Sequence, residues 1–69
     1  MSVYKVIELI GTSPDSWEEA AKEAVSRAGR SVRDLRVAEV NEMDMVVDRD
    51  GGVELFRCKL KVSFKHDGD

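Results

Sequence analysis

VELFRCKLKVSFKH, residues Val53–His66, is the stretch that decides the fold. Apolar and polar residues alternate along it, which predicts a β-strand with one buried and one exposed face. The apolar set is Phe56, Cys58, Leu60, Val62 and Phe64, and the polar set is Arg57, Lys59, Lys61, Ser63 and Lys65. The sequence favours a solvated face, or one that forms ion pairs between subunits, over a phosphate or nucleotide site inside an oligomer.

A hairpin is predicted immediately before this strand. Residues 49–52 read Arg-Asp-Gly-Gly, and an Asp-Gly pair supplies the positive φ that tight hairpin turns need. The preceding segment, Arg36–Asp48 (RVAEVNEMDMVVD), is predicted to be the partner strand. Strict alternation places Glu42, Asp44 and Asp48 on one of its faces, although neither face is cleanly polar.

A strand and a helix are predicted ahead of the hairpin. Ser2–Ile10 (SVYKVIELI) is rich in β-branched and aromatic residues, as strands are, and residues 11–14 (GTSP) are expected to end it. The helix can begin at Ser13, because a proline follows at the first helical position, or at Ser16, which opens a capping box. Gly29 is its expected C-terminal stop.

One face of this helix is apolar and narrow. Its members recur at helical spacing: Trp17, Ala20, Ala21, Ala24, Val25 and Ala28. Because most of them are alanine, the helix can lie close against a sheet, and Trp17 is expected to pack there rather than to stack on a ligand. Residues 31–35 are expected to be a short link and residues 67–69 a frayed tail. The order predicts one α+β domain over residues 1–69, β-α-β-β, with a three-stranded antiparallel sheet and one helix.

The chain is too short for the hydrophobic core of one β-α-β-β domain to stabilise it alone. A 69-residue chain buries only about 60% of its unfolded surface. Cys58 is the only cysteine, which excludes an intrachain disulfide and leaves no Cys/His set for a structural zinc ion. One helix also leaves apolar residues near solvent in a monomer, namely Val37, Met43, Met45, Val47 and Leu55. A homo-oligomer is therefore expected.

Composition narrows the class of function. A formal net charge of −3 is a poor basis for nucleic-acid binding, which needs a basic surface. The sequence predicts no leader peptide and no membrane-spanning segment, and an unpaired cysteine suits the cytoplasm, which is the expected location. His66 is the only histidine, and no nucleophile lies beside it in the sequence. We therefore expect no enzyme activity.

The ordered set YKVIELIGTS, an alanine-rich helix, LRVAEV and LKVSF resembles the dodecin family over essentially the whole chain. The resemblance implies a hollow dodecamer of cubic symmetry, in which each sheet wraps partly around its helix. It also implies a binding or storage role, since most members of the family bind flavins for storage or protective sequestration rather than catalysis.

The positions that correspond to the family's flavin pocket are altered here. Val37 stands where flavin-binding dodecins carry a stacking tryptophan, and Arg57 stands where they carry a glutamine that hydrogen-bonds the ring. Asp44-Met45 replaces an Arg-Gly pair. Loss of a stacking ring removes about 1–3 kcal/mol of affinity, judged from base–aromatic stacking. The sequence therefore makes flavin a doubtful cofactor.

Acidic residues take the place of that pocket. Glu42, Asp44 and Asp48 are the candidate metal ligands, because Ca²⁺ prefers several oxygen donors, and the sequence resembles the dodecin branch that lacks the tryptophan and is associated with calcium. Neighbours on one strand face stand about 6–7 Å apart, too far to enclose an ion, so another chain, backbone carbonyls or water must complete the shell.

Alternatives to the calcium interpretation remain open. The acidic residues could be a solvated strand face, and Asp48 and its neighbours a plain hairpin turn rather than a calcium loop. The protein could also be a flavin or nucleotide sequestration module with a remodelled pocket, or a structural assembly in which ions only join subunits.

Overall fold

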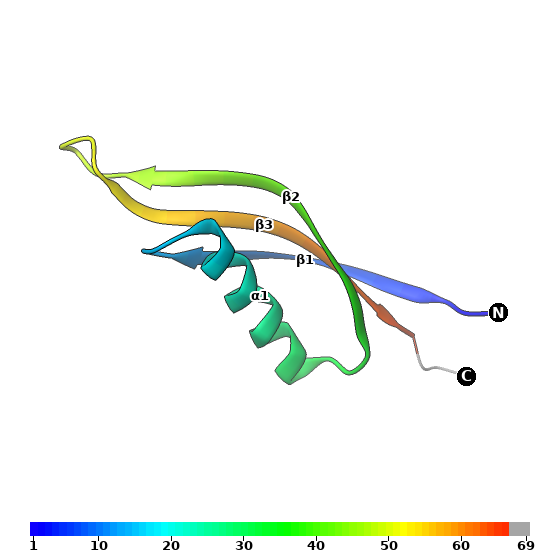
Figure 1. The fold of residues 1–69 in the computed structure, drawn as a ribbon. Helices are drawn as coiled ribbons and strands as arrows, with labels where there is room; N and C mark the ends of the chain where they lie inside the picture. Colours follow the sequence, from blue (N-terminus) through cyan, green and yellow to red (C-terminus); the bar gives the residue numbers. More distant parts are fainter. Residues whose placement is uncertain (67–69) are drawn as a thin grey trace.

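The computed structural model describes residues 1–66. Within them, β1 (Tyr4–Ser13), α1 (Trp17–Ser31), β2 (Leu35–Val47) and β3 (Val53–Lys65) follow in chain order. The strands form an antiparallel sheet in the order β1-β3-β2, and α1 lies against one face of it (Figure 1). The predicted β-α-β-β fold of the α+β class is confirmed.

The core lies between the middle strand and the helix. Cys58, Leu60 and Val62 of β3 are each about 1% exposed, since β3 pairs on both sides and α1 covers this face. Ala20 and Ala24 of α1 pack against Cys58 and Leu60. The alternation predicted for β3 and the alanine stripe predicted for the helix are both confirmed.

β1 begins at Tyr4 rather than at the predicted Ser2, and it runs beyond the predicted Ile10 because Gly11 belongs to the strand and not to a turn. The strand continues to Ser13, and Gly11 pairs with Cys58 in the ladder. A Cβ at Gly11 would collide with the carbonyl oxygen of Ala20 on the helix. Glycine is present here so that the helix backbone can approach the strand closely. The prediction that residues 11–14 end the strand was therefore wrong.

The helix begins after Ser16, one of the two starts predicted. The Ser16 hydroxyl accepts a hydrogen bond from the Glu19 backbone N–H at 3.0 Å, as an N-cap does. The alternative start, Ser13, instead accepts the backbone N–H of Asp15 at 3.0 Å and shapes the loop.

The helix does not stop at Gly29. It continues to Ser31, and the Val32 N–H closes it on the Ala28 carbonyl at 2.9 Å. The left-handed residue of this link is Asp34, with φ 61°, so Gly29 is not needed as the terminating residue.

A β-bulge gives β2 two distinct faces. Val40 pairs with Leu60 and Glu42 pairs with Lys59, so Asn41 is an extra residue between two ladder positions. The bulge moves the apolar set from even to odd positions. Ala38, Val40, Met43 and Met45 share the helix side, whereas Val37, Glu39, Glu42 and Asp44 share the opposite side, which we term the outer face. The mixed faces expected from strict alternation were wrong for this reason.

The chain is extended for its length. Its radius of gyration is 14.2 Å, against about 11 Å for a compact domain of this size. The β2–β3 hairpin lies at one end, and the N-terminus and the end of β3 lie at the other (Figure 1). Of the five apolar residues expected near solvent, Val37, Met43, Met45 and Val47 are exposed, and Leu55 is half-buried. No helix among the described residues is long and apolar enough to span a membrane.

Candidate metal site on the outer sheet face

Charged residues oppose one another across the outer face. The basic stripe of β3 runs between two strands that carry carboxylates, so cross-strand neighbours have opposite charge. The opposed pairs are Arg57–Asp44, Lys59–Glu42, Lys61–Glu39 and Lys61–Glu8. Carboxylates of the same chain therefore lie opposite the basic stripe, and Arg57–Asp44 is close enough to form an ion pair. Ion pairing of the stripe with other subunits stays a prediction.

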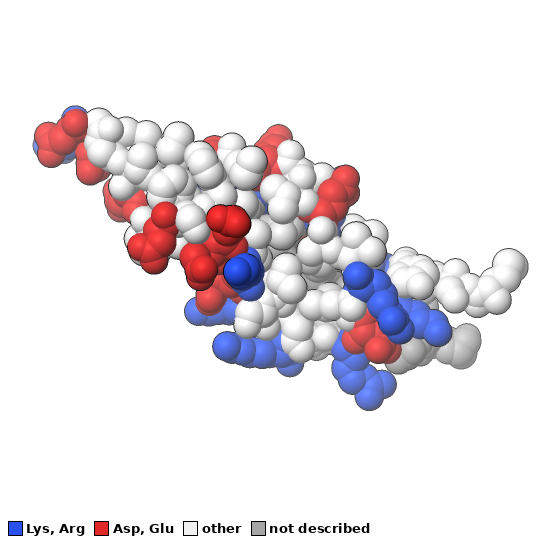
Figure 2. Space-filling view, viewed as in Figure 1, with Lys and Arg blue, Asp and Glu red and all other residues white. Residues whose placement is uncertain are grey.

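Charge is also uneven along the molecule. In Figure 2, acidic side chains gather towards the end that carries the hairpin, and most basic side chains lie along the lower side and the other end. A broad uncharged area lies between them on this face.

Asp44 and Arg57 form a two-pronged ion pair. The Arg57 Nε and Nη2 donate to Oδ1 and Oδ2 of Asp44 at 2.6 and 2.8 Å. The pKa of Asp44 is lowered, first by this hydrogen bond and also by the charge of Arg57, while partial desolvation opposes the shift. The carboxylate is therefore ionised throughout the neutral range and is fixed in orientation.

Asp44 shares a small hollow with Glu42. The hollow has a volume of about 120 Å³ and is lined by Ile10, Glu42, Asp44, Arg57 and Lys59. We call it the acidic hollow, because its carboxylates are the two oxygen-rich ligands that a hard cation would use. Two of the three metal ligands predicted from the sequence are thus neighbours.

Asp48 lies apart from the acidic hollow. A further register shift, between Val46 and Val47, ends the regular ladder, and Asp48 belongs to the turn. Its Oδ1 accepts the backbone N–H groups of Asp50 and Gly52, each at 2.9 Å. Asp48 therefore stabilises the hairpin, as the plain-turn alternative expected.

One chain supplies only part of a metal shell. Among residues 1–66, no three His, Cys, Asp or Glu side chains come together as an ion would require. Calcium takes 6–8 oxygen ligands. The acidic hollow can therefore be at most a portion of a site that other chains, backbone oxygens or water complete.

Trp17 fixes the strand segment that carries Asp44. Its Nε1 donates to the Asp44 carbonyl oxygen at 3.0 Å, and its ring meets Phe56 edge-on with centroids 5.0 Å apart. The expected packing role of Trp17 is confirmed. Its link to Asp44 was not predicted, because it depends on the register of β2, which the helical stripe does not reveal.

The buried thiol of Cys58 is not part of the site. Burial raises its pKa, with a smaller contribution from the charge of Asp44, and its Sγ donates to the Trp17 carbonyl oxygen at 3.3 Å. It is a core residue, as predicted.

The family model for dodecin matches residues 3–67 of the chain. The chain belongs to the dodecin family. It is 65% identical over 65 residues to the calcium dodecin of Mycobacterium tuberculosis, covering 94% of this chain and 90% of that protein. It is 36% identical over 63 residues to the dodecin of Thermus thermophilus, covering 91% and 90%. The resemblance noted in the sequence is confirmed.

Solved dodecin structures have the same fold. A crystal structure of the Mycobacterium tuberculosis protein, described as a calcium-chelating antigen with a novel calcium-binding site, superposes with a TM-score of 0.86 at 60% identity, covering 99% of this chain and 96% of that one. Dodecin from Streptomyces coelicolor gives 0.93 at 34% identity, with coverage of 99% and 96%.

In this dodecin, Val37 and Arg57, the two positions predicted to match the family's flavin pocket, share the outer face but do not meet. Val37 pairs with Ser63, six ladder positions along β3 from Arg57, which corresponds to about 20 Å. Val37 is 62% exposed. A pocket that used both positions would have to be assembled from more than one chain.

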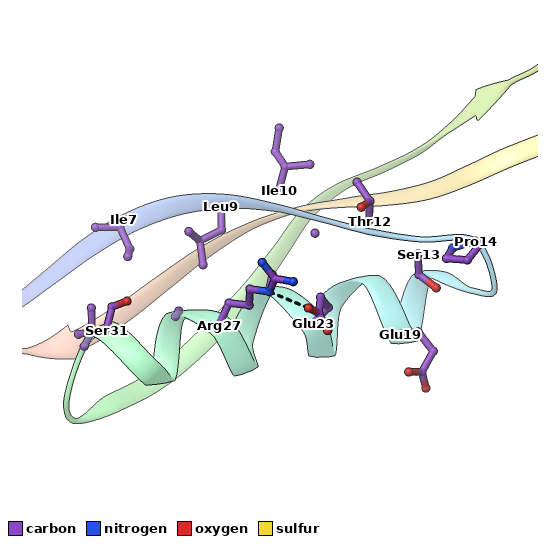
Figure 3. Close-up of a pocket in the computed structure, with 14 residues that line it drawn as sticks. Ile7, Leu9, Ile10, Thr12, Ser13, Pro14, Glu19, Glu23, Arg27 and Ser31 are labelled. Carbon is purple, nitrogen blue, oxygen red and sulfur yellow. Dashed lines mark hydrogen bonds and ion pairs between the residues drawn. The ribbon is translucent and has the colours of Figure 1, made fainter.

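A groove between β1 and α1 was not predicted from the sequence. It has a volume of about 680 Å³, and Leu9 points into it towards the helix while Ile10 points away (Figure 3). Glu23 and Arg27 of α1 form an ion pair of 2.8 Å at its margin. Its described lining includes no aromatic ring for a flavin to stack on. The groove lies at the open edge of β1 and reflects a helix that one chain does not fully enclose.

Proposed function

We propose that this dodecin is a homo-oligomeric binding protein whose ligand is a divalent cation, calcium, and that it has no catalytic activity. The observation that supports this most directly is the acidic hollow, where Glu42 and Asp44 stand side by side on a rigid sheet. We name calcium as the cation because the chain is 65% identical to the calcium dodecin of Mycobacterium tuberculosis.

Asp44 is the principal ligand in this proposal. The Trp17 indole holds its backbone carbonyl, and the register of β2 places its side chain on the outer face. Glu42 is the second ligand. Asp48 stands about 13 Å further along the chain, so its contribution would be to an ion shared with other chains.

Copies of the same chain are the proposed partners, twelve of them if the family assembly applies. The exposed apolar residues on both faces of the sheet, the open groove and the extended shape each indicate a chain that needs neighbours. Cytoplasmic location and the absence of nucleic-acid or membrane partners remain part of the proposal.

The alternative of a flavin or nucleotide module has less support. Val37 offers no ring, Arg57 is engaged by Asp44, and the groove has no aromatic lining in the described chain. A protein in which ions only join subunits would use the same carboxylates. It would differ in that removal of calcium would dissociate the oligomer.

Calorimetric titration of calcium into the chelator-stripped oligomer tests the proposal. We expect saturable binding in the parent, at least tenfold weaker binding in Asp44→Asn, and a smaller loss in Glu42→Gln. Glu23→Gln is the matched control, because Glu23 is also an exposed carboxylate paired with an arginine. Absence of calcium heat in the parent would refute the proposal, and light scattering of each sample separates binding from assembly.

A further inference from the structure

The acidic hollow is lined by positively charged side chains as well as by carboxylates. Its lining has two carboxylates, Glu42 and Asp44, and two basic side chains, Arg57 and Lys59. Their formal charges cancel, so the hollow as folded attracts a divalent ion only weakly. A cation that binds there must first overcome a counter-charge supplied by the chain itself.

Arg57 occupies both oxygens that calcium would use. Its fork contacts Oδ1 and Oδ2 of Asp44 at 2.6 and 2.8 Å. Calcium binds carboxylate oxygens at 2.3–2.6 Å. A guanidinium and a dication cannot both approach one carboxylate so closely without strong repulsion, so the two compete for Asp44.

Arg57 can be displaced at little cost. Its side chain is 40% exposed and that of Asp44 is 54% exposed, so the pair is in contact with water. Its β1 neighbour across the ladder is Thr12, which is uncharged and leaves that side open. A long, solvated arginine can turn away from the sheet without loss of core packing.

We propose that Arg57 is an internal competitor for the calcium site, which holds Asp44 in the ion-free protein and is displaced when the cation binds. The inference rests on the proposed calcium function and specifies how its affinity is set. It predicts that Arg57 lowers affinity in the parent and makes the protein a weak, readily reversible binder of the ion.

Calcium titration of Arg57→Gln in the intact oligomer tests this. Glutamine keeps polarity and loses the charge, and removing a unit charge close to a dication should tighten binding about tenfold. Arg57→Lys keeps the charge without the fork, so its gain should be smaller. Arg27→Gln is the control, since Arg27 forms a comparable exposed ion pair with Glu23, and its affinity should match the parent.

The other outcomes are distinct. Unchanged or weaker binding in Arg57→Gln, with the parent binding calcium, overturns the competitor role and leaves the proposed function standing. Binding in Arg57→Gln alone supports the competitor role and overturns the calcium function of the natural chain. Binding in neither overturns both. If Arg57→Gln fails to assemble, Arg57→Lys decides: binding no tighter than the parent's overturns the role.

Discussion

At the scale of single residues, the outer face consists mainly of cross-strand pairs of opposite charge, and no set of metal ligands is complete within the described residues. Arg57 and Asp44 face each other because the register of β2 and β3 brings them together, and Trp17 fixes the backbone beneath them. Val37 lies well away on the same face. These facts lead to predictions about flavin and about pH.

Flavin binding should be weak or absent. Titration of riboflavin, followed by its fluorescence, should show no saturable quenching at nanomolar protein, because Val37 offers no stacking surface. The double variant Val37→Trp, Arg57→Gln should recover part of the affinity, by about 1–3 kcal/mol for the ring. Tight quenching in the parent would show that flavin binds elsewhere, with the β1–α1 groove as the first place to examine.

The Asp44–Arg57 pair should give stability a specific pH dependence. The pKa of Asp44 is lowered in the folded protein, so its contribution is fully present above the ordinary aspartate range and is lost as the pH falls through the lowered value. The difference in melting temperature between the parent and Asp44→Asn should therefore be constant near neutral pH and vanish in strong acid. A difference that grew with acidification would contradict this sign.

At the scale of elements, close contact of helix and strand depends on Gly11. Gly11→Ala places a Cβ against the Ala20 carbonyl oxygen and should destabilise the protein by about 1–3 kcal/mol or more in chemical denaturation. Gly29→Ala is the matched control. Its Cβ would meet only the Leu35 Cδ1 at 3.8 Å, so it should stabilise by about 0.5–1 kcal/mol. Equal effects of the two variants would show that the close approach is not needed.

The elements also show how far sequence reasoning reaches. The alternation of β3 and the alanine stripe of α1 were predicted correctly. Each pattern is local in sequence and depends only on which face of the element is buried. Gly11 was wrongly assigned to a turn, because the need for glycine at this position arises only from the close approach of α1. The bulge at Asn41 has no local signal, so the separation of apolar from charged positions on β2 depended on its pairing with β3. The prediction that Glu42 and Asp44 share one face was correct, because both residues follow the bulge. The ion pair of Asp44 with Arg57 could not be predicted without the register of β2 and β3.

At the scale of the whole molecule, one chain is an incomplete unit. The sheet exposes apolar residues on both faces, α1 covers chiefly β1 and β3, and the shape is extended. The proposed metal site is incomplete in the same way, because residues 1–66 bring no three metal-binding side chains together. Ion binding is therefore expected to depend on assembly.

The protein should be a large closed oligomer at micromolar concentration. Light scattering after size exclusion should give a mass many times the 7.7 kDa of the chain. Covering the apolar residues is the driving force, so the assembly should persist at high salt. A native mass near that of one chain would contradict the need for partners.

The location of the ion in a crystal structure of the calcium-loaded oligomer tests the central claim most directly. We expect calcium density in the acidic hollow, within the usual 2.3–2.6 Å of an Asp44 carboxylate oxygen, with its shell completed by water, backbone or a neighbouring chain. Calcium bound elsewhere, with Asp44 making no contact to it, or no calcium in the loaded oligomer, would contradict the assignment.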